Sequence, residues 1–349
     1  MDFGARNYAF AEYDPPVVVA EIGVNHNGDP ELARRLVDAA VAVGADIVKF
    51  QAFKTEREIS RFAALAPYQA ETQSAATSQF DLCKTLELSN ASLRELRRHS
   101  EDRGVGFLCS TFDFDSFDFL ANDLRVKAVK LGSGEITNHP FLERIARHDM
   151  GVILSTGAST LDEVKEAVAT LSRAGSPEIV LLHCVSSYPA PLDQLNLRAM
   201  RTLKEEFSLP VGFSDHTIGI EAAVAAVALG AVAIEKHFTL DRSMAGPDHR
   251  ASAEPDELKR LVAAVRSVKA ALGDGTKRPA PSELTNRPLI RKGLVAKGRL
   301  YKGQRLTHDM IEIKRPAHGI DPREIDKAIG RELARDLDDD EPITWASLA

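Results

Sequence analysis

The chain has 349 residues, enough for one large core and a small second domain. Its hydrophobic content of 44% and charged content of 27% are ordinary for a soluble globular protein, and a formal charge of −7 argues against a broad nucleic-acid-binding surface. No apolar run approaches the roughly 18 residues that span a bilayer, and residues 1–16 contain no signal-peptide core. We therefore expect a cytoplasmic protein that binds neither nucleic acid nor membrane.

Short apolar runs alternate with helical stretches along most of the chain. The first run, 17–23, is followed by Asp29 and Pro30, a helix N-cap and a first-turn proline, which predict a helix to Val43. Further strands are expected at 46–51, 106–111, 128–133, 151–156, 178–184, 211–217 and 233–239, with helices at 89–103, 161–174, 197–207 and 220–230. Eight strands alternating with helices predict a parallel (β/α)8 TIM barrel.

Two features of this organisation stay open. An open doubly wound sheet is the alternative fold, although no GxGxxG motif follows the first strand. The segment 54–88 is rich in Ala and Gln and has no clear period, so it could be a lid or part of a substrate pocket.

The composition changes near the C-terminus, where residues 272–282 are rich in Gly and Pro. We expect a barrel domain over 1–272, a linker over 273–288 and a small β-rich domain over 289–349. The three cysteines, Cys83, Cys109 and Cys184, are odd in number and lack CxxC spacing, so neither a disulfide framework nor a cysteine zinc site is indicated.

Polar residues collect where the predicted strands end, which is where the active site of such a barrel lies. His216 and His237 end two consecutive parallel strands, and Ser214 and Glu235 share their faces because side chains two apart point the same way. Two imidazoles with nearby oxygen ligands suit a divalent transition metal with open positions, which can polarise a carbonyl. A hydrogen-bonded structural role for each histidine is the alternative.

Two lysines, Lys49 and Lys130, lie within otherwise apolar strands, and a buried ammonium needs an anionic partner. Either they form structural ion pairs with Glu21 and Glu235, or they hold a phosphate or carboxylate of a substrate. Three serines at strand ends would add donors to such an anion site: Ser133, Ser155 and Ser214. With Glu135 available for a proton or a water, these groups predict an enzyme that joins a phosphorylated acid to a carbonyl compound.

A series of motifs resembles that of the sialic acid synthase family, which includes legionaminic and pseudaminic acid synthases. The matching segments are AEIGVNHNG from Ala20, VKFQ from Val48, KLGSGE from Lys130, LSTG from Leu154, YP from Tyr188, GFSDHT from Gly212, KHF from Lys236 and GPDH from Gly246. Near the C-terminus, IKRP from Ile313 and GI from Gly319 resemble the family's antifreeze-like (SAF) domain. The resemblance covers nearly the whole chain from Val17.

The resemblance implies condensation of phosphoenolpyruvate with N-acetylmannosamine, or a related acetamido sugar, to a nine-carbon 2-keto acid and phosphate. It also implies a divalent metal, Mn²⁺ first, with Mg²⁺ or Co²⁺ as substitutes. A legionaminic or pseudaminic acid synthase that uses a 2,4-diacetamido-2,4,6-trideoxyhexose is the alternative within the family. Outside it, the alternatives are a metal-dependent pyruvate aldolase and a carbohydrate- or ice-binding protein whose barrel is only a scaffold.

By the same resemblance, His216 and His237 are metal ligands, and Glu135 acts as acid–base or water-orienting group beside the catalytic lysines, Lys49 and Lys130. The implied phosphoenolpyruvate-binding residues are Lys49, Lys130, Ser133, Ser155, Ser186 and Ser214. The implied sugar-binding residues are Glu21, Gln51, Tyr188, Asp248 and Arg315.

In the family, the arginine that Arg315 matches reaches into the partner subunit's barrel, so a domain-swapped homodimer is expected. Two positions depart from the family pattern: Ser186, where some sialic acid synthases have asparagine, and Phe112, where proline commonly follows Ser-Thr. Both bear on the choice of sugar more than on the reaction.

Overall fold

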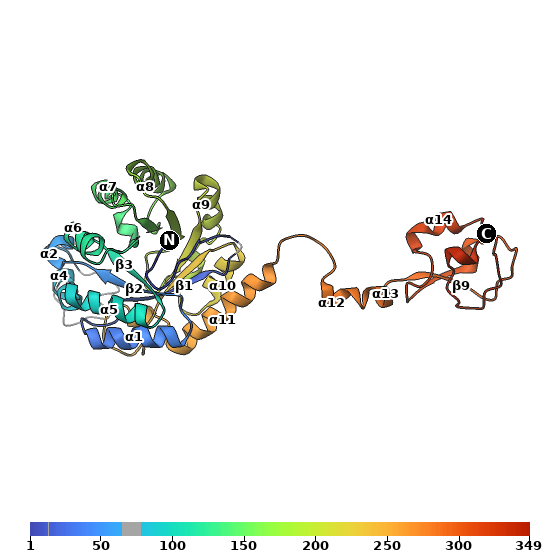
Figure 1. The fold of residues 1–349 in the computed structure, drawn as a ribbon, viewed down its shortest axis with the longest axis horizontal. Coiled ribbons are helices and arrows are strands. Elements are labelled where there is room, and N and C mark those ends of the chain that lie inside the picture. Colours follow the sequence, from blue (N-terminus) through green and yellow to red (C-terminus); the bar gives the residue numbers. More distant parts are fainter. Residues whose placement is uncertain (13, 65–77) are drawn as a thin grey trace. The chain divides into compact units, whose positions relative to one another are not determined.

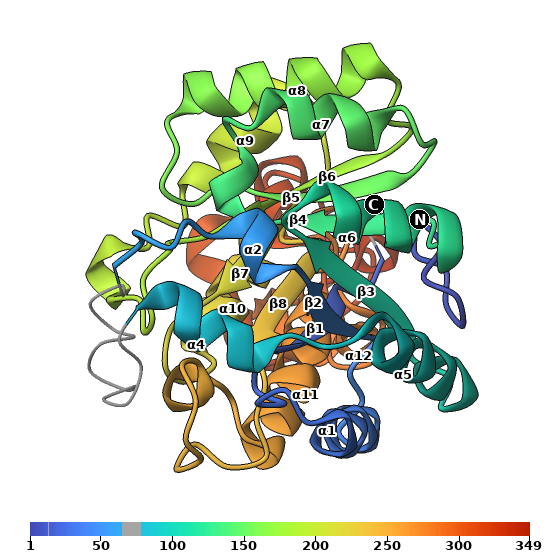
Figure 2. The same cartoon turned by 90° about the vertical axis from the view of Figure 1, so that its left-hand side faces the viewer.

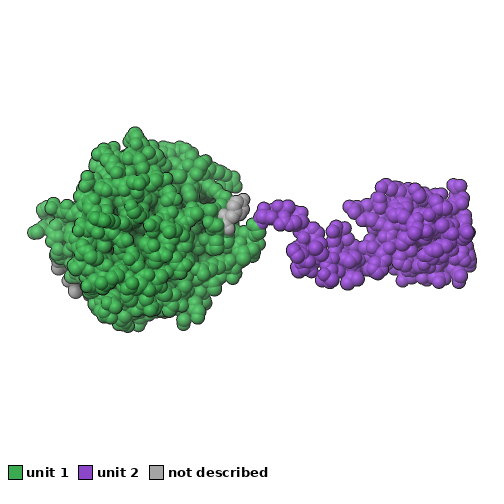
Figure 3. Space-filling view, in the orientation of Figure 1, with its two compact units in different colours: residues 1–273 green, residues 274–349 purple. Residues whose placement is uncertain are grey.

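The computed structural model describes residues 1–12, 14–64 and 78–349. The chain divides into two compact units, Met1–Gly273 and Asp274–Ala349, which Figure 3 colours separately. In the first unit the eight predicted strands form a closed parallel barrel in the order β1 to β8, with β8 pairing back to β1. The predicted (β/α)8 barrel is confirmed, and the alternative of an open sheet is wrong.

Helices surround the barrel (Figures 1 and 2). The strands are β1 Val17–Gly23, β2 Ile47–Ala52, β3 Gly106–Thr111, β4 Ala128–Leu131, β5 Gly151–Ser155, β6 Ile179–His183, β7 Val211–Asp215 and β8 Ala233–His237. The α-helices of this unit are α1 Pro30–Ala42, α2 Thr55–Glu58, α4 Gln79–Leu86, α5 Asn90–Asp102, α6 Phe114–Asp118, α7 His139–Ala146, α8 Leu161–Ala174, α9 Ala199–Phe207, α10 Glu221–Ala228 and α11 Pro255–Leu272. Within the described part of the chain, no helix is both long and apolar enough to cross a membrane.

Local sequence signals account for several element ends. Asp29 caps α1 by accepting the backbone N–H of Glu31, and Pro30 occupies the first turn, as predicted. Strand β4 ends two residues before the predicted Ser133, because the chain turns there into a short 3-10 helix, Ser133–Glu135. Strands β7 and β8 also end two residues early, at Asp215 and His237.

The barrel interior changes character along the strands. Toward their N-terminal ends the inward side chains are apolar, and Phe3 and Phe10 of the N-terminal segment pack against them. These apolar inward residues are Val17, Val19, Ile47, Leu108, Ala128, Ile153, Val180, Leu182 and Ala233. Two or four residues further along β1 to β5 and β8, inward positions become charged or hydroxylated although they remain buried. Because burying a charge is costly without a partner, the C-terminal end of the barrel is where a site is expected.

The second unit has its own small core. Short helices α12 Pro281–Leu284 and α13 Arg287–Ile290 precede an antiparallel pair of strands, β9 Gly293–Ala296 and β10 Ile311–Lys314. Helix α14 spans Ile325–Ala328. The buried core of this unit consists of Leu294, Ala296, Leu300, Leu306, Ile311, Ile320, Ala328, Leu333, Leu337, Ile343 and Leu348. This architecture agrees with the predicted small, loop-rich, β-containing domain.

Candidate active site

A cavity of about 300 Å³ opens at the C-terminal end of the barrel. Twelve of the predicted site residues line it: Glu21, Lys49, Gln51, Lys130, Ser133, Ser155, Ser186, Tyr188, Ser214, His216, His237 and Asp248. Two predicted site residues are not among the lining residues. Glu135 follows Gly134, which does line the cavity, and accepts a 2.8 Å hydrogen bond from Asn138. Arg315 is an exposed residue of the second unit, directly after β10.

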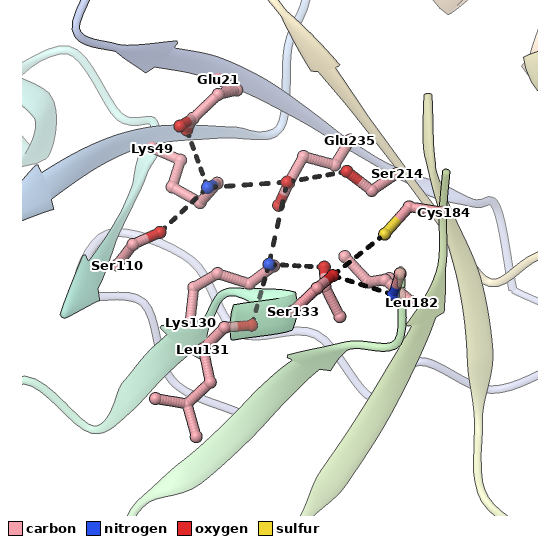
Figure 4. A network of polar contacts seen from close by, with 12 residues as sticks. Glu21, Lys49, Ser110, Lys130, Leu131, Ser133, Leu182, Cys184, Ser214 and Glu235 are labelled. Atoms are coloured by element: carbon pink, nitrogen blue, oxygen red, sulfur yellow. Dashed lines mark hydrogen bonds and ion pairs between the residues drawn. The ribbon is translucent and has the colours of Figure 1, made fainter. Parts of the chain in front are cut away.

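Both predicted lysines are buried beside carboxylates (Figure 4). Lys49 Nζ lies 3.0 Å from Glu21 Oε2 and 3.5 Å from Glu235 Oε1. Lys130 Nζ lies 3.9 Å from the same oxygen of Glu235. The ion pairs that the sequence offered as a structural explanation therefore exist, and they line the cavity. Glu235, which the sequence offered as a partner for the lysines and as an oxygen group beside His237, stands between the two ammonium groups.

The ionisable groups of this network differ in how their pKa values are shifted. Burial opposes ionisation of Glu235, but the ammonium groups of Lys130 and Lys49 outweigh it and lower the Glu235 pKa to about 2. Burial, reinforced by Glu235, raises the pKa of Glu21 to about 7 despite the neighbouring Lys49. The pKa of Lys130 is lowered, chiefly by burial. Two buried ammonium groups thus share two buried carboxyl groups, one of which burial makes harder to ionise, an arrangement that favours a bound anion.

Hydroxyl groups extend the network toward the cavity. Lys49 donates to Ser110 Oγ at 3.0 Å, and Lys130 donates to Ser155 Oγ at 2.7 Å. Ser214 donates a 3.0 Å hydrogen bond to Glu235. Ser110 lies in the strand predicted over 106–111 but was given no role, and its position opposite Lys130 in the β3–β4 register places it here. Each ammonium therefore has a hydroxyl partner, and both groups can donate hydrogen bonds to the same substrate anion.

Gly157 is needed for three polar side chains to converge. Its backbone N–H donates to Ser133 Oγ at 2.8 Å, and Ser133 Oγ lies 3.3 Å from Cys184 Sγ. A Cβ at this position would clash with Ser186 Oγ and approach Cys184 Sγ and Ser133 Oγ to 2.8 and 2.9 Å. Only glycine leaves room for this cluster at the cavity wall.

The two histidines face one another with their ring centroids 5.6 Å apart. His216 Nδ1 lies 2.7 Å from the carbonyl oxygen of Val185, which can only accept, so Nδ1 carries the hydrogen and Nε2 keeps a lone pair. His237 Nδ1 is buried without a hydrogen-bond partner and lies 3.5 Å from Asp248 Oδ2. Burial lowers the pKa of His216 to about 4 and the pKa of His237 well below its ordinary value.

Neutral imidazoles with available lone pairs are what a divalent metal requires, so these residues fit one. Tyr188 packs against the His216 ring with centroids 4.3 Å apart, which fixes the ring's orientation. The described residues contain no cluster of three or more His, Cys, Asp or Glu side chains suited to a metal ion.

Asp248 is held in place by a hydrogen-bonded clamp between the loops after β1 and β8. Buried Asn25 donates to Phe238 O at 2.9 Å and to Ser252 Oγ at 2.8 Å, and Ser252 donates to the backbone oxygen of Asp248 at 2.7 Å. The pKa of Asp248 is raised to about 6 by burial. Asn25 belongs to the AEIGVNHNG segment but was given no role from the sequence, and Ser252 was not identified.

Part of the segment left open by the sequence also lines the cavity. Helices α2 and α4 contribute Glu58, Gln79, Cys83 and Leu86, while 65–77 lie outside the described residues. One signal could have located α4. Ser78 caps it by accepting the backbone N–H of Asp81, a Ser-x-x-Asp pattern typical of a helix start.

Comparison with known proteins gives two family matches, the NeuB family over residues 36–277 and the SAF domain over residues 291–349. The chain is 46% identical to the N,N'-diacetyllegionaminic acid synthase of Campylobacter jejuni, over 94% of this chain and 98% of that protein. It is 36% identical to the human N-acetylneuraminate-9-phosphate synthase, over 94% of this chain and 91% of that protein. A crystal structure of the N-acetylneuraminic acid synthetase of Leptospira borgpetersenii matches with a TM-score of 0.70 and 36% identity, covering 78% of this chain and 90% of that one.

Proposed function

The chain belongs to the NeuB family, and on that basis we propose that it condenses phosphoenolpyruvate with an acetamido sugar to give a nine-carbon 2-keto acid and phosphate. The resemblance to sialic acid synthases with an SAF domain is confirmed. The observation that carries the proposed reaction is the cavity itself, where two buried lysines, each hydrogen-bonded to a serine hydroxyl, lie beside two neutral histidines. In a barrel that served only as a scaffold, burying these charged groups would destabilise the fold without any functional gain.

In the proposed reaction, C3 of phosphoenolpyruvate forms a bond to the aldehyde carbon of the sugar, and the aldehyde oxygen takes up a proton. Water then adds to C2 and gives up one proton, which balances the proton taken up by the aldehyde oxygen. The bond from C2 to the phosphate oxygen breaks as the remaining proton on the added oxygen passes to the phosphate. The phosphate leaves with that oxygen, and C2 becomes the ketone. Lys49 and Lys130 would hold the phosphate and carboxylate, because an anion offsets their mutual repulsion and burial. Ser133, Ser155 and Ser214 would donate to the same anion.

His216 and His237 would hold a divalent ion, Mn²⁺ in the first place, with Mg²⁺ or Co²⁺ as substitutes. When bound, such an ion polarises a carbonyl oxygen. Asp248, clamped against His237, would orient the sugar hydroxyls with Glu21, Gln51 and Tyr188. Glu135 keeps its proposed role of acid–base or water-orienting group.

For the acceptor we propose a 2,4-diacetamido-2,4,6-trideoxyhexose in preference to N-acetylmannosamine. Two relatives named N,N'-diacetyllegionaminic acid synthases support this choice, at 46% and 42% identity, against 36% for the relative named N-acetylneuraminate-9-phosphate synthase. Ser186 lines the cavity. A serine at this position, where some sialic acid synthases have asparagine, is more similar to the wider group that includes legionaminic and pseudaminic acid synthases.

Incubation with phosphoenolpyruvate, Mn²⁺ and the sugar, followed by mass spectrometry, tests the reaction. We expect one phosphate released for each keto acid formed, with the carbon atoms of both substrates in one product. Consumption of pyruvate instead of phosphoenolpyruvate would overturn the proposal in favour of an aldolase.

We also propose the domain-swapped homodimer that the resemblance implies, with Arg315 acting in the partner's barrel. Subunit mixing tests it. Arg315→Ala and His216→Ala proteins should each be nearly inactive, whereas dimers re-formed from a mixture should recover activity, because one intact barrel then meets one intact arginine. Absence of recovery in verified mixed dimers would show that Arg315 does not act across subunits.

A further inference from the structure

Beyond the strand ends, much of the cavity lining near α2 and α4 is apolar, although Glu58 and Gln79 of these helices also line it. Six lining residues share this character and form what we call the apolar wall: Val24, Phe53, Ile59, Cys83, Leu86 and Phe112. Most of them pack together in a small cluster that is separate from the clusters around and within the barrel. The rings of Phe53 and Phe112 meet edge to face with centroids 6.4 Å apart. The Cys83 thiol adds no charge, because burial raises its pKa to about 12.

The wall is fixed in position by its supports. Helix α4, which carries Cys83 and Leu86, is followed by Glu87, whose carboxylate accepts the backbone N–H of Thr55 at 2.7 Å. Lys84 on α4 pairs with Glu56 on α2 at 2.8 Å. Gly28 has φ +75°, and a Cβ there would clash with the Thr85 carbonyl oxygen, so glycine lets the β1 loop approach the end of α4. These contacts hold the side chains of the apolar wall in fixed positions.

The geometry of the proposed reaction decides which part of a sugar can meet this wall. The aldehyde carbon must lie at the strand ends, beside His216 and His237 and the lysine network. C6 is the carbon of a hexose farthest from the aldehyde. The wall is built from α4 and from the residues just after β1, β2 and β3, whereas the two histidines stand at the ends of β7 and β8. A methyl group is suited to such a surface, whereas a hydroxymethyl group would lose hydrogen bonds to water there.

Resting on the proposed function, we propose that the apolar wall binds the methyl end of a 6-deoxy acceptor and selects it over the corresponding 6-hydroxy sugar. Gln79 and Glu58 also line this part of the cavity and supply polar partners for an amide. The C4 acetamido group can therefore hydrogen-bond to them instead of contacting only apolar side chains. An apolar pocket rejects an added hydroxyl only moderately. We therefore expect a preference of roughly 10- to 100-fold in kcat/KM.

The test uses two acceptors that differ by one oxygen atom, a 2,4-diacetamido-2,4,6-trideoxyhexose and its 6-hydroxy counterpart. Leu86 and Leu82 provide matched variants, since both are on α4, both are 5% exposed and both belong to the same small cluster, but only Leu86 lines the cavity. Leu86→Asn should lower the 6-deoxy preference by about tenfold, because it offers the extra hydroxyl a partner. Leu82→Asn should leave the preference unchanged even if it destabilises the protein.

The preference is a ratio measured on one preparation, so a reduced folded fraction cancels from it. If Leu86→Asn does not fold, Val24→Thr introduces a hydroxyl at the wall with little change of shape and should lower the preference in the same direction. Equal kcat/KM for the two sugars in the unaltered protein, or an equal change in both leucine variants, would overturn the inference. Phosphate release with neither sugar would instead overturn the proposed function on which it rests.

Discussion

The ammonium of Lys49 and the carboxylate of Glu235 lie 3.5 Å apart inside the barrel, on strands β2 and β8 that are separated by β1. Glu235→Gln removes the charge that both lysines share, and Lys130 then has no carboxylate within ion-pairing distance among the described residues. Because a buried ion that loses its partner is strongly destabilising, we expect the free energy of unfolding to fall by about 3–5 kcal/mol without ligand.

Phosphoenolpyruvate should offset part of this loss, because it supplies the missing negative charge. Urea unfolding with and without phosphoenolpyruvate measures both effects. Glu221→Gln, at an exposed carboxylate at the start of α10, is the control and should change stability by less than about 0.5 kcal/mol. Equal stability of Glu235→Gln and the unaltered protein would show that the lysines do not depend on Glu235.

The affinity for phosphoenolpyruvate should fall as the pH rises, and the fall should begin at a lower pH than deprotonation of an ordinary lysine would cause. The pKa of Lys130 is lowered by burial and by Lys49, so its ammonium is lost as the pH rises through that lowered pKa, before an ordinary lysine would deprotonate. Calorimetric titration between pH 7 and about 10 should therefore show a steadily rising Kd. Affinity that stays constant over this range would contradict the lowered pKa.

Manganese binding should depend on the two facing histidines. Removing either imidazole by His216→Ala or His237→Ala should weaken Mn²⁺ binding by at least about tenfold in calorimetry, a readout that needs no turnover. His183→Ala is the matched control, because His183 ends the neighbouring β6, hydrogen-bonds the Leu195 carbonyl at 2.7 Å and does not line the cavity. If all three variants bind Mn²⁺ alike, the metal site lies elsewhere.

Substitution of Asn25 should raise the KM for the sugar more than the KM for phosphoenolpyruvate. In Asn25→Asp the side chain can no longer donate to the Phe238 carbonyl or to Ser252, so the clamp on Asp248 opens. Losing such buried hydrogen bonds costs about 1–3 kcal/mol, which corresponds to roughly a 5- to 150-fold rise in the KM for the sugar. The KM for phosphoenolpyruvate should change little. A parallel rise in both KM values would indicate general damage to the barrel instead.

Much of this site was predictable because strand alternation is strictly local. Once the strands are placed, a period of two brings Lys49, Ser214 and Glu235 into the barrel without further information. The contact between Asn25 and Ser252 joins residues 227 positions apart through loops, and no local pattern encodes it. Helix α4 escaped prediction for another reason, since its cap follows a long Ala- and Gln-rich stretch without a clear period.

Phosphate release from phosphoenolpyruvate, measured with Mn²⁺ and either 2,4-diacetamido-2,4,6-trideoxyhexose or N-acetylmannosamine, tests the central claim most directly. We predict release that requires both sugar and metal, is faster with the diacetamido sugar, and stops when EDTA is added. Release that does not need a sugar, or no release with either sugar, would contradict the proposed condensation.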